Sequence, residues 1–279
     1  MDLNDLLDRI ERSYDAIPRV AGGRVEHIGP FELFIRQGPG WPWYARPRLG
    51  TTDVTIADVE AVLRRQRELD LPESIEWVLD VTPSLLDAIP PRLTVTRAPL
   101  MVLDPAALPD PDPRAVMLSV DADDFVVSHQ LCGAVAAVAF APAEPVADHT
   151  APVAPVAGPA QRDAAVRPVS PEMIEVVTAD LRSGRVAEAA VIDPVDGIVA
   201  CGSYQSALGG AEIVGVATLP SHRRRGLGAA VSAVLARHAL SHGNELVFLS
   251  AADETVARVY ARIGFRRVGT AGIAAPGEH

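Results

Sequence analysis

The sequence predicts a mixed α/β fold in which helices flank a central mixed sheet. After residue 187, apolar segments of strand length alternate with stretches of helical periodicity. The composition agrees, because 48% of the residues are hydrophobic and 22% are charged, as is typical of a globular protein with a substantial core. The N-terminal third repeats the same order of elements more faintly, which indicates an internal duplication.

The C-terminal elements have clear boundaries. A helix is predicted over residues 171–182, because Ser170 is a suitable N-cap and Pro171 suits the first helical position. A second helix should start at Leu227, and a third should run from Asp253 to Arg262. Strands are predicted over residues 187–193, 197–206, 211–220, 245–251 and 265–275. A strand–helix–strand order requires a right-handed crossover that places its two strands side by side.

The N-terminal third follows the same plan with weaker signals. Its segments are a strand and turn, a helix, a strand, a helix and a strand, over residues 42–50, 56–69, 75–81, 82–89 and 93–103. We interpret this part as an incomplete copy in a tandem arrangement. The predicted domains are therefore residues 1–110, degenerate, and residues 111–279, complete.

Two biased segments lie in the second predicted domain. Residues 141–165 are rich in Ala, Pro and Val, and repeated prolines disfavour a helix, so a mobile loop is predicted. Residues 125–143 carry no charge and approach the length of a membrane span. Ser128 and His129 lie inside that stretch and favour a buried core helix instead. The charged, helical N-terminus does not fit a signal peptide.

Charge and cysteine content narrow the function. The net charge of −11 makes general nucleic-acid binding unfavourable and suits cationic partners such as amines. Cys132 and Cys201 form no CxxC pair, and the histidines show no zinc-site spacing. These observations predict a cytoplasmic protein without a structural metal, a membrane span or a nucleic-acid partner.

The stretch PSHRRRGLGA, residues 220–229, joins a predicted strand to a predicted helix. The first amides of a helix lack intrahelical partners, and its dipole places partial positive charge there. Gly226 and Gly228 permit positive φ and close approach of a ligand, so successive amides can hold a phosphate. The run matches neither a P-loop nor a complete Rossmann fingerprint.

The sequence around this turn resembles the GNAT acyl-CoA-dependent N-acetyltransferases. Their signature, [RQ]xxGx[GA] after a strand, is matched by residues 223–228, and the V-x-x-x-P strand before it is matched by residues 216–220. The family's N-x-x-A-x-x-x-Y-x-x-x-GF helix is matched by residues 253–265, except that Asp253 replaces the asparagine and Val256 the alanine. The strong match covers residues 185–272, in the predicted catalytic domain.

The resemblance implies acetyl transfer from acetyl-CoA to a small or peptide amine. The backbone of the strand residues Val216, Ala217 and Thr218 would pair with the pantetheine arm. Tyr260 would act as general acid toward the leaving thiolate, and Glu212 as base. Asp253 would lie near the cofactor, where its carboxylate could repel phosphate. The pyrophosphate would be held by the amides of Arg223, Arg224, Arg225, Gly226, Leu227, Gly228 and Ala229.

Other readings stay open from the residues alone. The arginines also suit a solvated surface run, Tyr260 a core position and Glu212 an exposed strand position. Cys201 is expected in the core, and Trp41 and Trp43 with Tyr44 in the core of the first half. A catalytically silent acyl-CoA-binding sensor or scaffold is the alternative function. Acceptor identity, acyl-chain preference and oligomeric state are not indicated.

Overall fold

The computed structural model describes residues 2–40, 42–141 and 156–277, which pack into two compact units. Unit 1 comprises residues 1–107, 206–212 and 243–279, and unit 2 comprises residues 108–205 and 213–242. The units therefore interleave along the chain, whereas the predicted domains follow one another. The division into a degenerate copy and a catalytic domain stays a prediction.

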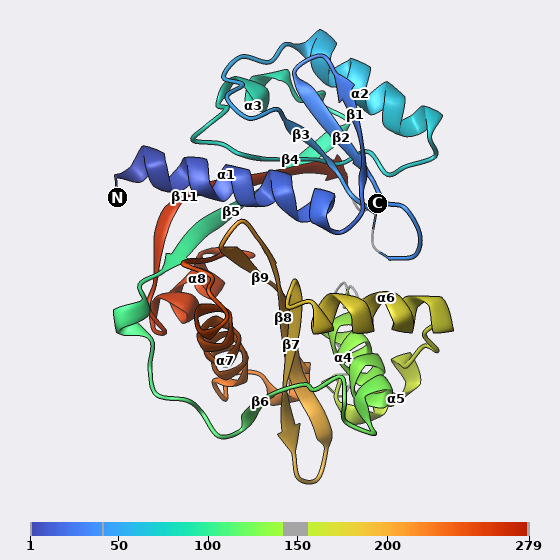
Figure 1. The fold of residues 1–279 in the computed structure, drawn as a ribbon, viewed down its shortest axis with the longest axis vertical. Helices are drawn as coiled ribbons and strands as arrows, with labels where there is room; N and C mark the ends of the chain where they lie inside the picture. Colours follow the sequence, from blue (N-terminus) through green and yellow to red (C-terminus); the bar gives the residue numbers. More distant parts are fainter. Residues whose placement is uncertain (1, 41, 142–155, 278–279) are drawn as a thin grey trace, which may run out of the picture. The chain divides into compact units, whose positions relative to one another are not determined.

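Unit 1 is a mixed sheet with helices on it (Figure 1). Its strands lie in the order β1-β2-β3-β4-β11-β5-β10, followed by the first residues of β9. The C-terminal strand β11 lies antiparallel between β4 and β5, so residues 1–107 alone do not form this sheet. The elements are α1 (Leu3–Val20), β1 (Arg24–Ile28), β2 (Phe31–Ile35), β3 (Ala45–Pro47), α2 (Ile56–Glu68), β4 (Ile75–Val78), α3 (Ser84–Ala88), β5 (Leu93–Leu103), η1 (Pro105–Ala107), β10 (Leu246–Ser250), α8 (Glu254–Ala261) and β11 (Phe265–Pro276).

Two apolar cores hold the helices on this sheet. Helices α2 and α3 pack with Trp77 and its neighbours, while α1 packs with Val78 and Phe248. Consecutive strand residues point to opposite faces, so Trp77 and Val78 place these helices on opposite sides of β4. Trp43 is buried as predicted, in a third cluster with Phe34, while Trp41 lies outside the described residues.

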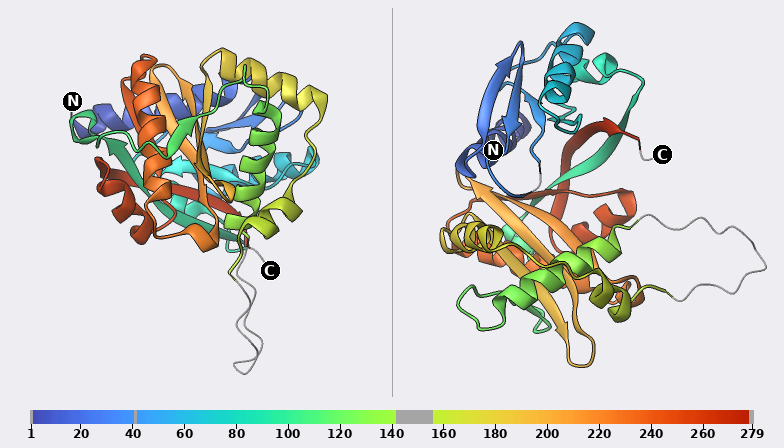
Figure 2. Two further views of the ribbon diagram at one scale, coloured as in Figure 1. Left: turned by 90° about the horizontal axis from the view of Figure 1, so that it is seen from below. Right: turned by 90° about the vertical axis from the view of Figure 1, so that its right-hand side faces the viewer.

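Unit 2 contains strands β6 to β9 with helices on both faces. Helix α7 lies on one face of its strands, and α4, α5 and α6 lie on the other (Figures 1 and 2). The order of strands is β9-β8-β7-β6, and β6 and β8 both run antiparallel to β7. The elements are β6 (Ala115–Met117), α4 (Phe125–Ala139), α5 (Pro159–Ala165), α6 (Pro171–Arg182), β7 (Val186–Asp193), β8 (Gly197–Ala207), β9 (Gly210–Thr218), η2 (Pro220–His222) and α7 (Leu227–Ser241), with β8 and β9 each continuing into unit 1.

Most predicted elements are confirmed, and their local causes are visible. Ser170 caps α6 by accepting the Met173 amide at 3.2 Å, and Pro171 takes the first helical position. The predicted crossover places β9 and β10 side by side and parallel, with Gly210 to Glu212 opposite Leu246 to Phe248. Strand β10 is buried along most of its length, as its apolar sequence predicts.

Three predictions need correction or fall outside the described residues. Residues 159–165 of the predicted loop form helix α5, because Pro159 stands at the first turn, where its missing N–H removes no helical hydrogen bond. Residues 142–155 of that loop lie outside the described residues. The helix predicted from Phe125 is confirmed, but it is not buried all round, since 56% of Val127 is exposed. Along the described chain, no helix is long and apolar enough to cross a membrane.

Candidate functional site

The chain between β9 and α7 adopts an unusual backbone conformation in unit 2. Leu219 donates its amide to the Val199 carbonyl at 2.9 Å, which fixes the start of the turn on β8. Arg223 is then extended, Arg224 has φ of 63° and Gly226 has φ of 77°. A positive φ is natural for Gly226 but strained for an arginine. Such strain tends to persist at ligand-binding sites.

Helix α7 begins without a side-chain cap. Gly226 is its N-cap residue and supplies no hydrogen-bonding side chain. In the described part of the chain, the first amide of the helix with a backbone acceptor is that of Ala230, which donates to the Gly226 carbonyl at 3.0 Å. The amides from Leu227 to Ala229 are therefore available to an anion, at the positive end of the helix dipole.

Gly228 lies close to β9. A Cβ atom placed there would be 3.6 Å from Val216 Cγ1 and 3.7 Å from Thr218 Oγ1, which is ordinary van der Waals contact. Protein packing alone would thus accept a small side chain at Gly228. A glycine at position 228 also leaves room for a ligand to approach the backbone closely, which is a separate reason for its presence.

The three arginines have different surroundings. Arg223 donates through Nη2 to the Ala139 carbonyl at 2.7 Å and through Nε to the Thr218 carbonyl at 3.4 Å, so it ties the turn to α4 and β9. Arg224 and Arg225 are exposed, and the Arg225 carbonyl accepts from Arg114 Nη1 at 3.4 Å. Arg223 thus has a structural role, and the other two side chains extend into solvent.

His222 anchors the same turn. It is 4% exposed, its Nδ1 lies 2.9 Å from Ser221 Oγ, and its Nε2 lies 3.2 Å from Asp196 Oδ2. Both ring nitrogens are therefore engaged in holding the turn.

Strand β9 carries the residues expected to bind the pantetheine arm. Ala217 is buried, while Val216 and Thr218 are half-buried. Gly215, just before them, has φ of 63° and interrupts the regular strand geometry. The parallel register with β10 covers Gly210 to Glu212, so the three predicted residues follow the paired stretch.

Glu212 lies in unit 1 and is only 9% exposed, so the reading of an ordinary exposed strand residue is wrong. Its charge raises the pKa of three neighbouring groups, those of Tyr14, Tyr44 and Glu76. Burial is the largest cause at each of them. The pKa of Glu76 is raised to about 8, although the charge of Arg46 lowers it. Glu212 is therefore part of a buried, net acidic cluster.

Arg46 is the cation of this cluster. It is 2% exposed, and its Nη2 donates to Glu11 Oε1 at 2.7 Å. Its guanidinium also lies 4.4 Å from the centre of the Tyr14 ring, within the range of a cation–π interaction. In the sequence, Arg46 lies in the predicted strand and turn of residues 42–50 and has no motif around it. The cluster joins residues far apart in the chain, so no local motif could indicate it.

Tyr260 and Asp253 also lie in unit 1. Tyr260 is 8% exposed, and its ring meets Phe265 edge to face at a centroid distance of 5.9 Å. Asp253 is the N-cap of α8, since its Oδ1 accepts the amides of Thr255 and Val256 at 2.7 and 2.8 Å. Capping accounts for a carboxylate at this position. The predicted catalytic roles are not tested by these contacts.

The predicted site residues fall in both units. The turn and β9 from Val216 to Thr218 belong to unit 2, whereas Glu212, Asp253 and Tyr260 belong to unit 1. Within the described ranges, no group of three His, Cys, Asp or Glu side chains could hold a metal ion.

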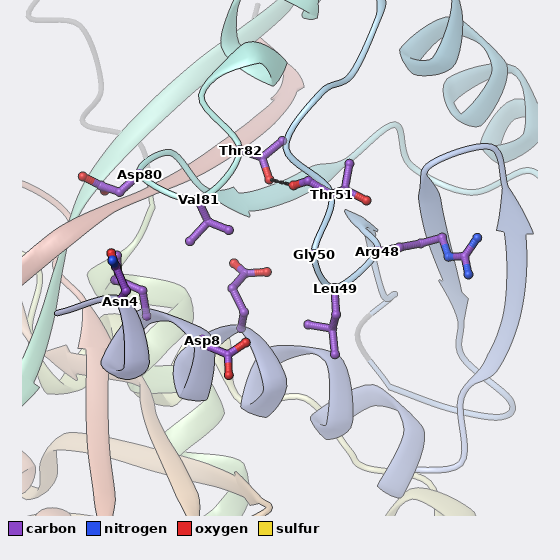
Figure 3. Close-up of a pocket in the computed structure, with 11 residues that line it drawn as sticks. Asn4, Asp8, Arg48, Leu49, Gly50, Thr51, Asp80, Val81 and Thr82 are labelled. Carbon is purple, nitrogen blue, oxygen red and sulfur yellow. Dashed lines mark hydrogen bonds between the residues drawn. The ribbon is translucent and has the colours of Figure 1, made fainter. Parts of the chain in front are cut away.

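A cavity of about 280 Å³ lies in unit 1 between α1 and the loops after β3 and β4 (Figure 3). Three carboxylates line it, and each has its own partner: Asp8 pairs with Arg12 at 2.8 Å, Glu11 with Arg46, and Asp80 with the Thr270 amide at 2.7 Å. Thr82 Oγ1 donates to the Thr51 carbonyl across its wall at 2.8 Å. The three carboxylates of this cavity therefore serve the fold.

Part of this chain matches the model of a known protein family. The family described as FR47-like protein matches residues 201–271, which span β9, the turn, α7 and α8. No curated protein matches the chain.

Solved structures match nearly the whole chain. A GCN5-related N-acetyltransferase from Kribbella flavida has a TM-score of 0.66 at 22% identity, covering 98% of this chain and 97% of that one. A putative acetyltransferase of the GNAT family from Novosphingobium aromaticivorans has a TM-score of 0.52 at 20% identity, covering 91% and 92%. A GCN5-related N-acetyltransferase-like protein from Streptococcus suis has a TM-score of 0.51 at 14% identity, covering 98% and 99%. The predicted resemblance and fold class are confirmed.

Proposed function

We propose that this chain, which has the fold of the GCN5-related N-acetyltransferases, transfers an acetyl group from acetyl-CoA to an amine. The coarser part of the proposal, acyl-CoA-dependent acyl transfer, is supported by that fold and by the FR47-like match over residues 201–271. The amine acceptor, the roles of individual residues and the cytoplasmic location are further parts of this proposal.

One observation carries the proposal: the strained turn before α7. Arg224 holds a positive φ, Gly226 follows in the left-handed region, and the first helical amides have no side-chain cap. Successive amides in such a conformation form a concave anion site. In a protein of acidic net charge, an uncapped helix start flanked by two exposed arginines suits a pyrophosphate. Val216 and Thr218 would extend the site by pairing with the pantetheine amides.

The chemistry requires a neutral amine and a stabilised leaving thiolate. The amine nitrogen attacks the thioester carbonyl, the C–N bond forms, and the C–S bond breaks. The nitrogen loses a proton, and the thiolate gains one. Tyr260 is proposed to supply the second proton, because a phenol with pKa near 10 can protonate a thiolate as it leaves. Glu212 is the proposed acceptor of the first, in keeping with its buried position.

Acetyl-CoA binding is the first test. Arg225→Glu should weaken binding in calorimetry, and Gly228→Val should block it by filling the space against the α7 amides. Arg64→Glu is the matched charge reversal, because Arg64 is an exposed arginine on α2. Arg64→Glu should bind like the wild type. If Arg225→Glu and Gly228→Val also bind like the wild type, the pyrophosphate assignment fails.

Turnover is the second test. Wild-type protein with acetyl-CoA and a panel of primary amines should release free thiol, measured with a chromogenic disulfide. The panel would include spermidine, 2-phenylethylamine, an amino acid amide and a lysine-containing peptide. Binding of acetyl-CoA without thiol release for any amine would contradict the transferase and favour an acyl-CoA-binding sensor.

A further inference from the structure

A second cavity, of about 200 Å³, lies in unit 2 between α4 and the strands β7, β8 and β9. Its wall contains His129 and Cys132 from α4, Glu188 from β7, Cys201 from β8 and Gly215 from β9. These residues bring the chain's two cysteines and an imidazole–carboxylate pair to one hollow. Nothing in the proposed function above uses it.

His129 and Glu188 form a well-defined pair on this wall. Nδ1 of His129 lies 3.0 Å from both carboxylate oxygens of Glu188, and the two side chains are 20% and 14% exposed. The Phe125 ring stacks on the imidazole at a centroid distance of 6.0 Å. A carboxylate on Nδ1 selects the tautomer with its proton on that nitrogen, so Nε2 is left as a proton acceptor. In the described residues, Nε2 has no protein partner.

The cavity adjoins the strand assigned to the cofactor arm. Gly215 lines the cavity and immediately precedes Val216, the first residue proposed to pair with pantetheine. Gly215 is exposed and has φ of 63°, so this point of β9 departs from regular strand geometry. A thioester carried along β9 would therefore run beside the mouth of the cavity.

We propose that this cavity binds the acceptor amine and that His129, positioned by Glu188, takes the proton from the amine nitrogen during acetyl transfer, in place of Glu212, which does not line the cavity. The inference rests on the proposed function. As the C–N bond forms and the C–S bond breaks, the proton moves from nitrogen to Nε2 of His129, and the thiolate takes its proton from the group proposed at Tyr260. His129 then returns its proton to solvent and Tyr260 regains one from solvent, so the cycle balances without a further reactant.

The cavity is small, with a volume of about 200 Å³, and it is partly open to solvent. That space suits a small primary amine or the aminoalkyl end of one side chain. The acceptor class is therefore a small aliphatic amine, or a lysine side chain presented on an extended segment.

The other titratable groups around His129 do not compete for its proton. Cys132 lies one turn along α4, and its pKa is raised by a hydrogen bond with Cys201 and by burial, so it stays a thiol. Arg162, on the packed helix α5, is held by Asp163 and by the carbonyls of Asp196 and Ile198. Glu188 is thus the group that acts on His129. The hydrogen bond with Glu188 raises the pKa of His129 above its ordinary value, and the negative charge of Glu188 adds a smaller increase.

The test compares His129→Gln with wild type, using the amine that gives the fastest thiol release in the panel. We expect kcat to fall by about 10²- to 10⁴-fold, as for loss of a general base. The affinity for acetyl-CoA in calorimetry should not change. In wild type, kcat should rise with pH through a pKa above about 6.5, and His129→Gln should lose that rise. Glu188→Gln should keep part of the activity and shift the rise to lower pH.

Two controls make the result specific. His27→Gln removes an exposed histidine that lies 3.5 Å from Glu32, a pair of the same kind outside the cavity, and should leave kcat unchanged. Gly133→Leu adds a side chain to the cavity wall, at a position where a Cβ atom would meet no other atom within 4 Å, and should raise the KM for the amine without changing the affinity for acetyl-CoA. His129→Asn provides a second variant if His129→Gln does not fold.

The outcomes separate this inference from the proposed function. Wild-type turnover with an unchanged pH profile in both His129 variants would overturn the role of His129 while leaving the transferase intact. An unchanged KM for the amine in Gly133→Leu would overturn the cavity as the amine site. An inactive wild-type protein would overturn both proposals together.

Discussion

Glu76 should make the protein less stable as the pH rises, and Glu76→Gln should remove that loss. The pKa of Glu76 is raised from an ordinary 4.5 to about 8, first by burial and then by the charge of Glu212. Between these values the folded state keeps a proton that the unfolded state has released. Stability is therefore fullest below pH 4.5 and falls as the pH rises toward 8.

The magnitude follows from the size of the shift. One unit of pKa corresponds to about 1.4 kcal/mol. The two pH units from pH 5 to pH 7 correspond to about 2.8 kcal/mol. With allowance for solvent at a side chain that is only half-buried, the expected loss over this range is about 2 kcal/mol. Glu76→Gln should be close to wild type at pH 5 and about 2 kcal/mol more stable than it at pH 7. Glu212→Gln should recover a smaller part, because it removes one of the charges that act on Glu76.

Urea unfolding followed by circular dichroism at pH 5, 6, 7 and 8 measures this difference. Glu175→Gln is the control, because Glu175 is an exposed carboxylate on α6 and its replacement should add no pH dependence. Equal pH dependence in wild type and Glu76→Gln would refute the reasoning. It would show that Glu76 ionises in the folded protein as easily as in the unfolded one.

The remaining predictions concern other residues of unit 1. Arg46→Met leaves Glu11 without its buried cation and should cost about 3–5 kcal/mol in urea unfolding, most of which Glu11→Gln should restore; an additive loss would contradict this pairing. Asp253→Ala should cost about 1 kcal/mol of stability and Asp253→Asn almost none, because asparagine also caps helices; acetyl-CoA should bind Asp253→Asn more tightly in calorimetry if the carboxylate repels phosphate. Tyr260→Phe should lower kcat about 10²-fold or more without weakening acetyl-CoA binding, and a wild-type kcat would remove its role as general acid.

The C-terminal elements could be predicted because local chemistry fixes them. Ser170 and Pro171 start α6, and the apolar period from Leu227 defines α7. The β1–β2 hairpin was not predicted from the sequence. Strand β1 is short and partly exposed, and Gly29 and Pro30 supply its turn without a strong pattern on either side. Its place at the edge of the unit 1 sheet depends on tertiary packing, which a local pattern does not encode.

The candidate site also has one part that the sequence could predict and one part that it could not. The turn from Arg223 to Ala229 could be located from sequence, because a glycine-containing strand–helix junction has a local signature. The pairing of His129 with Glu188 could not, since 59 positions separate them and each looks ordinary where it stands. In the sequence, His129 is only a polar residue within an apolar helix. Its partner becomes visible when α4 lies over β7.

The turn itself shows how the structure changes the meaning of a motif. Three consecutive arginines suggest that side-chain charge holds the ligand, but Arg223 is occupied with the carbonyls of Ala139 and Thr218. That contact fixes the chain just before Arg224 enters the left-handed region. The strain at Arg224 and the missing cap at Gly226 leave the backbone amides, rather than the guanidinium groups, as the part that the fold prepares in advance. A phosphate bound there would therefore owe its position to the backbone, and Arg224 and Arg225 would add attraction from solvent that weakens with salt.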